Sequence, residues 1–332
     1  MIDLDAVTNG NRLALSRLLS EVENETKAGR SALDQLFIRS GRAHLVGITG
    51  SPGTGKSTLV SSLARNIRNE YGKSVAIVAI DPSSPFTGGA ILGDRVRMRD
   101  LAGDPGVFIR SMASRGALGG LARATAGMVQ VLDAAGFDIV MIETVGAGQS
   151  EVDIARLAHT TIVVESPGLG DDIQAIKAGI LEIVDILVIN KADLPGVENT
   201  ERALRANLDL GHILQMNHTA GHAMSVTENE GQSDGWKPPV IKTIATQNSG
   251  IDEVVSAIFT HRAFLQDSGL WHQRDQERLR TEVAHLLRTA LVQRWQQTVT
   301  EQKYEAVLQQ VFERKLSPGA AIDALINNAN PL

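Results

Sequence analysis

The chain has 332 residues, 43% of them hydrophobic and 21% charged, with a formal net charge of −6 and no cysteine. This composition is ordinary for a globular protein, the length fits about two domains or one large α/β domain with appendages, and the negative charge gives no general attraction for nucleic acid or anionic lipid. Without cysteine there are no disulfides, thiol nucleophiles or thiolate metal sites, so any metal would be held by oxygen or imidazole ligands.

The first 40 residues predict a helical extension. The acidic start lacks the basic segment and apolar core of an export signal, and no apolar run approaches the roughly 20 residues that span a bilayer. Leu15, Leu18 and Val22 recur at near-helical spacing. We therefore expect helices in residues 1–40 that pack on the next domain, and a cytoplasmic protein with no membrane or nucleic-acid partner.

A phosphate-binding motif follows in residues 44–60, HLVGITGSPGTGKSTLV. The motif fits the P-loop pattern G-x-x-x-x-G-K-[ST] between an apolar run and a helical pattern. In such a loop the backbone N–H groups wrap the phosphates, the lysine reaches the β and γ oxygens, and the hydroxyl is a ligand of Mg²⁺. The residues that we predict to contact nucleotide here are Gly50, Pro52, Gly53, Thr54, Gly55, Lys56, Ser57 and Thr58.

Short apolar runs alternate with helical patterns after this motif. The runs cover residues 75–80, 107–110, 139–142, 161–164, 186–189 and 240–244. This alternation predicts an α/β fold with a mostly parallel sheet covered by helices on both faces, and such sheets bind ligands at the carboxyl ends of their strands. We predict a P-loop domain over residues 41–262.

The remainder of the chain falls into a polar segment and a helical tail. Residues 211–239 are polar and rich in glycine, and we expect a surface loop there. Residues 263–332 regain helical spacing, and Ser317 followed by Pro318 predicts the start of a last helix. Such a tail either covers the nucleotide domain or pairs with another copy of itself, and the helical pattern leaves both alternatives open.

Three acidic residues are candidate ligands for magnesium. Glu143 ends an apolar run at the carboxylate position of a Walker B element, and Gly146 completes a D-x-x-G pattern with glutamate in place of aspartate, so its N–H could sense a γ-phosphate. Asp81 ends another run, and Asp94 lies thirteen residues later. Carboxylates suit Mg²⁺, which usually keeps several waters. The alternative for the two aspartates is turn capping by Asp81 and a solvated Asp94.

A base-reading motif lies at the end of a further run, where Asn190, Lys191 and Asp193 form N-K-x-D. The carboxylate of Asp193 can accept hydrogen bonds from both N1–H and the 2-amino group of guanine. Adenine offers no such pair of donors, and a site built for that pair discriminates strongly against a base that lacks it. The motif therefore predicts GTP as the nucleotide.

Together these stretches resemble one family closely, the MeaB/ArgK GTPases, which are relatives of the human methylmalonic aciduria type A protein. The resemblance covers residues 47–240 and is carried by GITGSPGTGKSTL, AIDPSSPFTGGAILGDRVRM, ETVGAGQSEVDIA, ESPGLGDDIQAIKAGI, NKAD and WKPPV. The long second stretch makes the resemblance specific to this family rather than to P-loop proteins in general.

This resemblance implies a GTP-hydrolysing chaperone of adenosylcobalamin-dependent methylmalonyl-CoA mutase, which gates cofactor loading and protects or reactivates the mutase. It also implies a homodimer formed through the C-terminal helices, a GTP/GDP site with Mg²⁺, and a partner-responsive switch in residues 165–177. By carry-over, the metal ligands are Ser57, Asp81, Asp94 and Glu143. The catalytic residues are Lys56, Asp81, Asp94, Glu143 and Gly146.

One position departs from the family pattern. The Ser-Ala pair expected beside the base is Ile244 and Ala245 in this chain. The N–H of Ala245 could still meet the guanine carbonyl, but the hydroxyl of the preceding serine is missing.

Two alternative functions remain. A metallochaperone GTPase that inserts nickel or cobalt would be expected to carry cysteine or a histidine run, and this chain has neither. A kinase of a transport-system binding protein is compatible with a P-loop fold, but the sequence shows no second substrate site.

Overall fold

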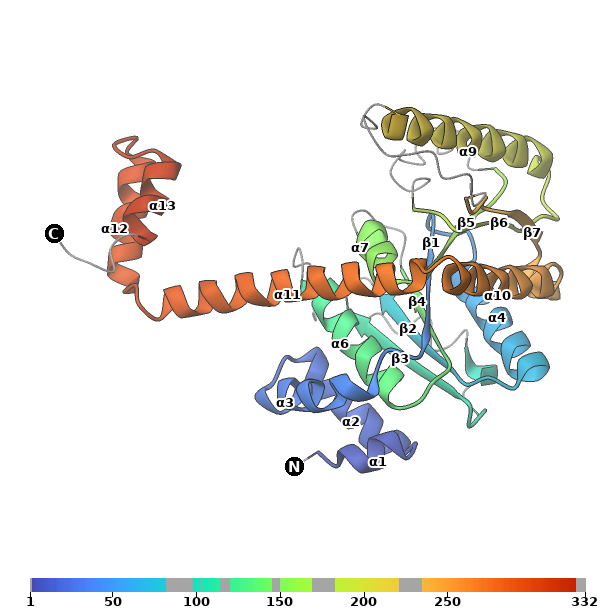
Figure 1. Cartoon of the computed structure of the whole chain (residues 1–332), viewed down its shortest axis with the longest axis horizontal. Coiled ribbons are helices and arrows are strands. Elements are labelled where there is room, and N and C mark those ends of the chain that lie inside the picture. Colours follow the sequence, from blue (N-terminus) through green and yellow to red (C-terminus); the bar gives the residue numbers. More distant parts are fainter. Residues whose placement is uncertain are drawn as a thin grey trace, which may run out of the picture. The chain divides into compact units, whose positions relative to one another are not determined.

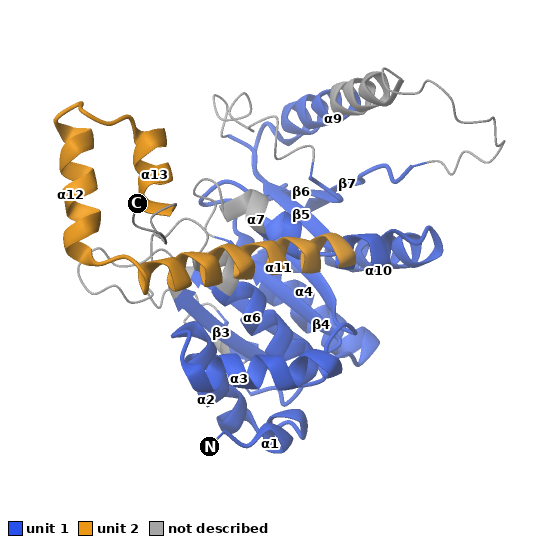
Figure 2. Ribbon diagram, turned by 60° about the vertical axis from the view of Figure 1, so that its left-hand side comes forward, with its two compact units in different colours: residues 1–275 blue, residues 276–332 orange. Residues whose placement is uncertain are grey.

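The computed structural model describes residues 2–81, 98–101, 103–113, 120–144, 150–168, 183–220 and 235–326 (Figure 1). The chain forms two compact units, residues 1–275 and residues 276–332 (Figure 2). The first unit contains the sheet and the P-loop, and the second contains most of one long helix and the two helices that follow it.

The first unit is built on a seven-stranded sheet in which every pair of neighbouring strands is parallel. The strand order is β3-β2-β4-β1-β5-β6-β7. In chain order the strands are β1 (His44–Thr49), β2 (Val75–Asp81), β3 (Val107–Ala113), β4 (Ile139–Glu143), β5 (Thr160–Glu165), β6 (Ile186–Asn190) and β7 (Val240–Thr243). The strand that leads into the P-loop, β1, is the central strand of the sheet. Its residues are buried on both faces, as its apolar sequence requires. The predicted α/β fold is confirmed.

Helices cover both faces of this sheet, as Figure 1 shows. On one face lie α2 (Arg12–Glu23), α3 (Lys27–Leu36), α6 (Gly120–Ala134) and α7 (Ser150–Leu157), preceded by the short α1 (Leu4–Thr8). On the other lie α4 (Lys56–Tyr71) and α10 (Ile251–Asp267). Alternate residues of each buried strand point to the two faces, so Leu45 contributes to the first core and Val46 to the second.

The helices predicted in the first 40 residues are present. Asn11 caps α2, its side chain accepting hydrogen bonds from the N–H groups of Leu13 and Ala14. The buried face of α2 packs on α6 in the first core. An ion pair between Glu23 and Arg110 of β3, 2.6 Å long, joins this helix to the sheet.

Two predicted boundaries were wrong. The strand β3 continues to Ala113 instead of ending at Arg110. The pairing of β3 with β2 continues as far as Ala113, opposite Asp81, so the strand extends three residues beyond the predicted run. Helix α9 (Val197–Ala220) runs ten residues into the segment predicted as a loop. The helix continues through Gly211, the first residue of that segment, because one glycine inside a helix costs only about 1 kcal/mol.

The second unit has a small core of its own. It contains most of α11 (Leu270–Gln296), then α12 (Glu301–Phe312) and α13 (Pro318–Ile326). Val307, Ala321 and Leu325 are buried together, and the indole of Trp295 donates to the carbonyl of Leu325 at 3.1 Å. The predicted start of α13 is confirmed, because Ser317 Oγ accepts a hydrogen bond from the N–H of Ala320. Among the described residues, no helix has the length and apolar character needed to cross a bilayer.

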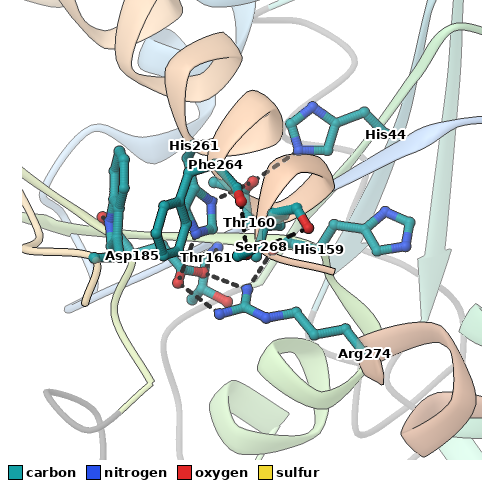
Figure 3. A network of polar contacts seen from close by, with 11 residues as sticks. His44, His159, Thr160, Thr161, Asp185, His261, Phe264, Ser268 and Arg274 are labelled. Carbon is teal, nitrogen blue, oxygen red and sulfur yellow. Dashed lines mark hydrogen bonds and ion pairs between the residues drawn. The ribbon is translucent and has the colours of Figure 1, made fainter. Parts of the chain in front are cut away.

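A buried polar network lies at the amino ends of β1, β5 and β6, the edge opposite the P-loop (Figure 3). Thr160 is its centre, with its hydroxyl 2.7 Å from Nε2 of His44 and 2.9 Å from Nδ1 of His261. Asp185 accepts a hydrogen bond from the N–H of Thr161 at 2.8 Å and lies 3.2 Å from Nε2 of His261. The network therefore joins the starts of three strands to helix α10.

The same network holds the first turns of α11. Both guanidinium NH₂ groups of Arg274 donate to Asp185, at 2.9 and 3.0 Å. His159 lies 3.0 Å from the carboxylate of Asp275, and its ring stacks on Trp271. Burial by itself would raise the pKa of Asp185, but hydrogen bonds from His261 and Arg274 outweigh burial and lower it. Asp185 is therefore an ionised carboxylate inside the fold.

The free energy of unfolding is expected to fall as the pH is lowered from 7.5 to about 5.5. Burial holds the pKa of His44 well below its usual value of 6.5. Four neighbouring groups lower it further when they carry positive charge: His159, Arg262, His261 and Arg274. The unfolded chain takes up a proton near its unperturbed pKa while the folded chain does not, so acid favours unfolding, by at most about 1.4 kcal/mol per pH unit.

Urea midpoints at pH 7.5, 6.5 and 5.5 would measure this dependence. The variant His44→Asn cannot take up the proton, and its midpoints should depend less on pH in this window. An equal slope in the variant and the parent protein would contradict the assignment to His44.

Candidate functional site

The P-loop connects β1 to α4 at the carboxyl edge of the sheet, and two of its glycines are required by their surroundings. Gly50 has φ 134°, and a Cβ atom there would overlap the carbonyl oxygen of Val164 in β5. Gly55 has φ 89°, and a Cβ atom there would lie 2.5 Å from Nδ2 of Asn190. Both backbone conformations and both close approaches exclude side chains. The loop is therefore pressed against β5 on one side and the N-K-x-D motif on the other.

Lys56 is the first residue of α4, and its side chain extends back across the P-loop. Its Nζ donates to the carbonyls of Gly50 at 2.8 Å and Ser51 at 2.9 Å. The hydroxyl of Thr54 also donates to the carbonyl of Ser51, at 2.9 Å, and tightens the turn. An ammonium group at the amino end of a helix, where free N–H groups already favour anions, is suited to bind phosphate.

Ser57 and Glu143 form the candidate magnesium site. The hydroxyl of Ser57 donates to Oε1 of Glu143 at 2.6 Å, and both side chains are buried. The register of β1 on β4 sets Glu143 opposite Ile48. A hydrogen bond of 2.9 Å from Thr144 to Thr49, between buried hydroxyls, fixes the two strand ends to each other. The structure thus brings together a hydroxyl and a carboxylate, the ligand types that Mg²⁺ prefers.

The other predicted metal and switch residues are described less completely. Asp81 ends β2, the strand beside β4, so its backbone lies at the same edge of the sheet as Glu143. Asp94 and Gly146 lie outside the described residues.

Glu165 is a second buried carboxylate beside the P-loop. It ends β5 and accepts a hydrogen bond from the hydroxyl of Ser51 at 3.3 Å. We expected Glu165 only as the first residue of a switch, not as a partner of the P-loop. One signal for this contact was present in the sequence, the position of Glu165 at the end of an apolar run. The sequence did not show that β5 pairs with β1, which is what brings Glu165 beside the P-loop.

The N-K-x-D motif contacts the P-loop directly. Nδ2 of Asn190 donates to the carbonyl of Thr54 at 2.8 Å, and Nζ of Lys191 donates to the carbonyl of Gly53 at 2.7 Å. Asp193 follows in an exposed turn. The base-reading motif and the phosphate loop therefore form one continuous surface at the carboxyl edge of the sheet.

The backbone of Ala245 lies beside this motif. Its N–H donates to Oδ1 of Asn190 at 3.1 Å. The hydroxyl of Thr243 donates to the same oxygen, also at 3.1 Å. Asn190 is thus held on three sides by buried hydrogen bonds. Thr58, also predicted to contact nucleotide, lies in the first turn of α4.

A parallel sheet with a P-loop after its central strand, a buried Ser-Glu pair and an adjacent N-K-x-D motif defines the class of P-loop GTPases. The family model described as "Methylmalonyl Co-A mutase-associated GTPase MeaB" matches residues 15–300. The chain therefore belongs to the MeaB family, and it is an enzyme of the GTP-hydrolase class that binds guanine nucleotide.

Individual relatives agree with this assignment. A protein of Pyrococcus abyssi is 42% identical over 98% of this chain and 96% of its own length. The mitochondrial methylmalonic aciduria type A homolog of Caenorhabditis elegans is 31% identical over 96% of this chain and 74% of its own length. A crystal structure described as LAO/AO transport system kinase is 26% identical, covers 97% of this chain and 94% of its own, and superposes with a TM-score of 0.65.

Proposed function

We propose that this protein is a GTP-hydrolysing chaperone of an adenosylcobalamin-dependent methylmalonyl-CoA mutase, which gates cofactor loading and protects or reactivates the mutase. The observation that carries this proposal is the match to the mutase-associated GTPase family over residues 15–300. The site geometry supports the nucleotide part, because the phosphate loop, the Ser-Glu pair and the base-reading motif meet at one edge of the sheet.

In this proposal each predicted residue has a defined role. Lys56 holds the β and γ phosphates, and Asp193 reads guanine. Ser57 and Glu143 hold Mg²⁺ with help from Asp81 and Asp94, and Gly146 senses the γ-phosphate. The close pairing of Ser57 with Glu143 fits a magnesium ion, which neutralises charge on the phosphates.

The contact between Ser51 and Glu165 supports a link from the nucleotide to the partner. Lys56 and Glu165 both bind Ser51, one at its carbonyl and the other at its hydroxyl. When the ammonium group turns to phosphate it releases that carbonyl, so nucleotide binding changes the environment of Ser51. Glu165 begins the segment 165–177, which we propose as the partner-responsive switch.

The second unit supports the proposal of a homodimer. Along α11, several apolar side chains are exposed on the isolated chain: Val283, Leu286, Leu287, Leu291 and Val292. Val283, Leu286, Leu287 and Leu291 recur at helical spacing, and an exposed apolar stripe of this kind is typical of a helix that pairs with another surface. We propose that a second copy of the chain covers it, so sedimentation should show a dimer.

The chaperone proposal is tested by titrating purified mutase into the full-length protein and measuring phosphate release from GTP. The rate is expected to rise by at least about tenfold, since a residue that a partner supplies to a GTPase site can raise kcat by roughly 10³- to 10⁵-fold. Repeating the titration with the variant Lys56→Ala shows whether the phosphate is released by this protein and not by the added mutase. An unrelated acyl-CoA enzyme controls for non-specific effects of added protein. An unchanged rate up to a molar excess of mutase would defeat the proposal, and transfer of labelled phosphate to a protein would favour a kinase.

A further inference from the structure

The loop after β7 contacts the nucleotide site without the serine that the family pattern places at position 244. This loop closes on itself, with Ile244 and Ser249 exchanging backbone hydrogen bonds of 3.1 and 3.3 Å. Within it, residues Ala245–Gln247 form a single 3₁₀ turn. Because Ala245 provides the backbone beside the base-reading motif, the position of this turn sets the geometry of guanine recognition.

A hydroxyl from α4 holds this turn in place. Oγ of Ser62 donates to the carbonyl of Ala245 at 2.9 Å, across 183 positions of sequence. The N–H of Ala245 donates to Asn190, so the peptide groups on both sides of this residue are anchored. Ser62, Ala245 and Asn190 are each no more than 5% exposed. Water therefore does not replace these hydrogen bonds easily, and each bond helps to fix the position of the turn.

The helix that carries Ser62 also carries the phosphate ligands. α4 begins at Lys56, and Ser57 contacts Glu143 from its first turn. Ser62 lies five residues after Ser57 on the same rigid element. The neighbouring Ser61 makes a different contact, because its hydroxyl donates to the carbonyl of Ser57 within the helix, also at 2.9 Å. Only one of these two adjacent buried serines therefore reaches the base-side loop.

We propose that Ser62 is a positioning residue for guanine recognition, which fixes Ala245 and Asn190 from the P-loop helix where the hydroxyl at position 244 is missing. The inference rests on the binding of guanine nucleotide. It goes beyond that binding by assigning base discrimination to a residue outside the P-loop and N-K-x-D motifs. Discrimination between guanine and adenine by hydrogen bonds depends strongly on the geometry of the donors and acceptors. A small displacement of the turn should therefore reduce the preference for guanine.

The test compares Ser62→Ala with the matched variant Ser61→Ala in the full-length protein. Competition binding with GDP, ADP and pyrophosphate separates the base contribution from the phosphate contribution. In Ser62→Ala the Kd for GDP should rise about fivefold to tenfold, because a buried carbonyl loses its donor. The Kd values for ADP and pyrophosphate should change less than about twofold on the same reasoning. Ser61→Ala should keep the guanine preference of the parent protein.

Several outcomes would overturn the role of Ser62: an unchanged ratio of GDP to ADP affinity in Ser62→Ala, an equal loss in Ser61→Ala, or an equal weakening of pyrophosphate binding. If Ser62→Ala fails to fold, Ser62→Cys keeps the volume with a weaker donor and should lower the same ratio. A parent protein that binds GDP no better than ADP would instead contradict guanine binding itself, so the two failures are distinguishable.

Discussion

Replacing Lys56 with alanine is expected to lower the rate of GTP hydrolysis at saturating nucleotide by roughly 10²- to 10³-fold. This is the loss measured when one preorganised donor to a developing negative charge is removed from an enzyme site. The Nζ of Lys56 is bonded to the carbonyls of Gly50 and Ser51 within the loop. Lys56 is the one basic side chain of residues 50–57, and the neighbouring Lys191 is bonded to the carbonyl of Gly53.

The control for this prediction lies on the same helix. Arg65 is a partly exposed cation of α4 whose ion pair with Asp100 is 3.4 Å long. Arg65→Ala should retain the rate of the parent protein, because the side chain faces away from the loop and surface pairs contribute little. Phosphate release under single-turnover conditions, with thermal unfolding to show that both variants fold, is the measurement. A Lys56→Ala protein that hydrolyses GTP within a few-fold of the parent would remove Lys56 from the catalytic residues.

Replacing Asp185 with alanine is expected to destabilise the first unit by about 3 kcal/mol. Removing one member of a buried ion pair typically costs 3–5 kcal/mol, and the lower value applies here because Arg274 is one-third exposed. The change also leaves the buried N–H of Thr161 without its acceptor. For a unit of this size the unfolding midpoint should fall by about 6–12 °C.

Asp138 offers a matched control, since it also precedes a strand and also accepts a backbone N–H. It receives the N–H and hydroxyl of Ser74, each at 2.8 Å, but its side chain is 43% exposed. Asp138→Ala should therefore cost about 1 kcal/mol, because water can replace the lost carboxylate. Equal losses in the two variants, measured by urea unfolding, would show that burial of Asp185 is not what makes its ion pair important.

The chemistry of the site was readable from local patterns. The P-loop requires its glycines, lysine and hydroxyl at close spacing, and the guanine-reading N-K-x-D motif is equally short. Each apolar run predicted as a strand became one, because buried parallel strands need a continuous apolar sequence. Boundaries were harder to predict. The strand predicted over residues 107–110 continues to Ala113 because its pairing with β2 does, and α9 continues past Gly211 because a helix tolerates one glycine.

By itself, the sequence determined that this protein binds and hydrolyses a nucleoside triphosphate in a parallel α/β fold, because those properties depend on residues close together along the chain. Only the tertiary structure decided how distant side chains contact one another in the site. The strand order places β4 and β5 on either side of β1, so Glu143 reaches Ser57 and Glu165 reaches Ser51. Ser62 meets Ala245 because α4 packs beside the turn that follows β7. Such contacts depend on how the elements pack, and no local pattern records them.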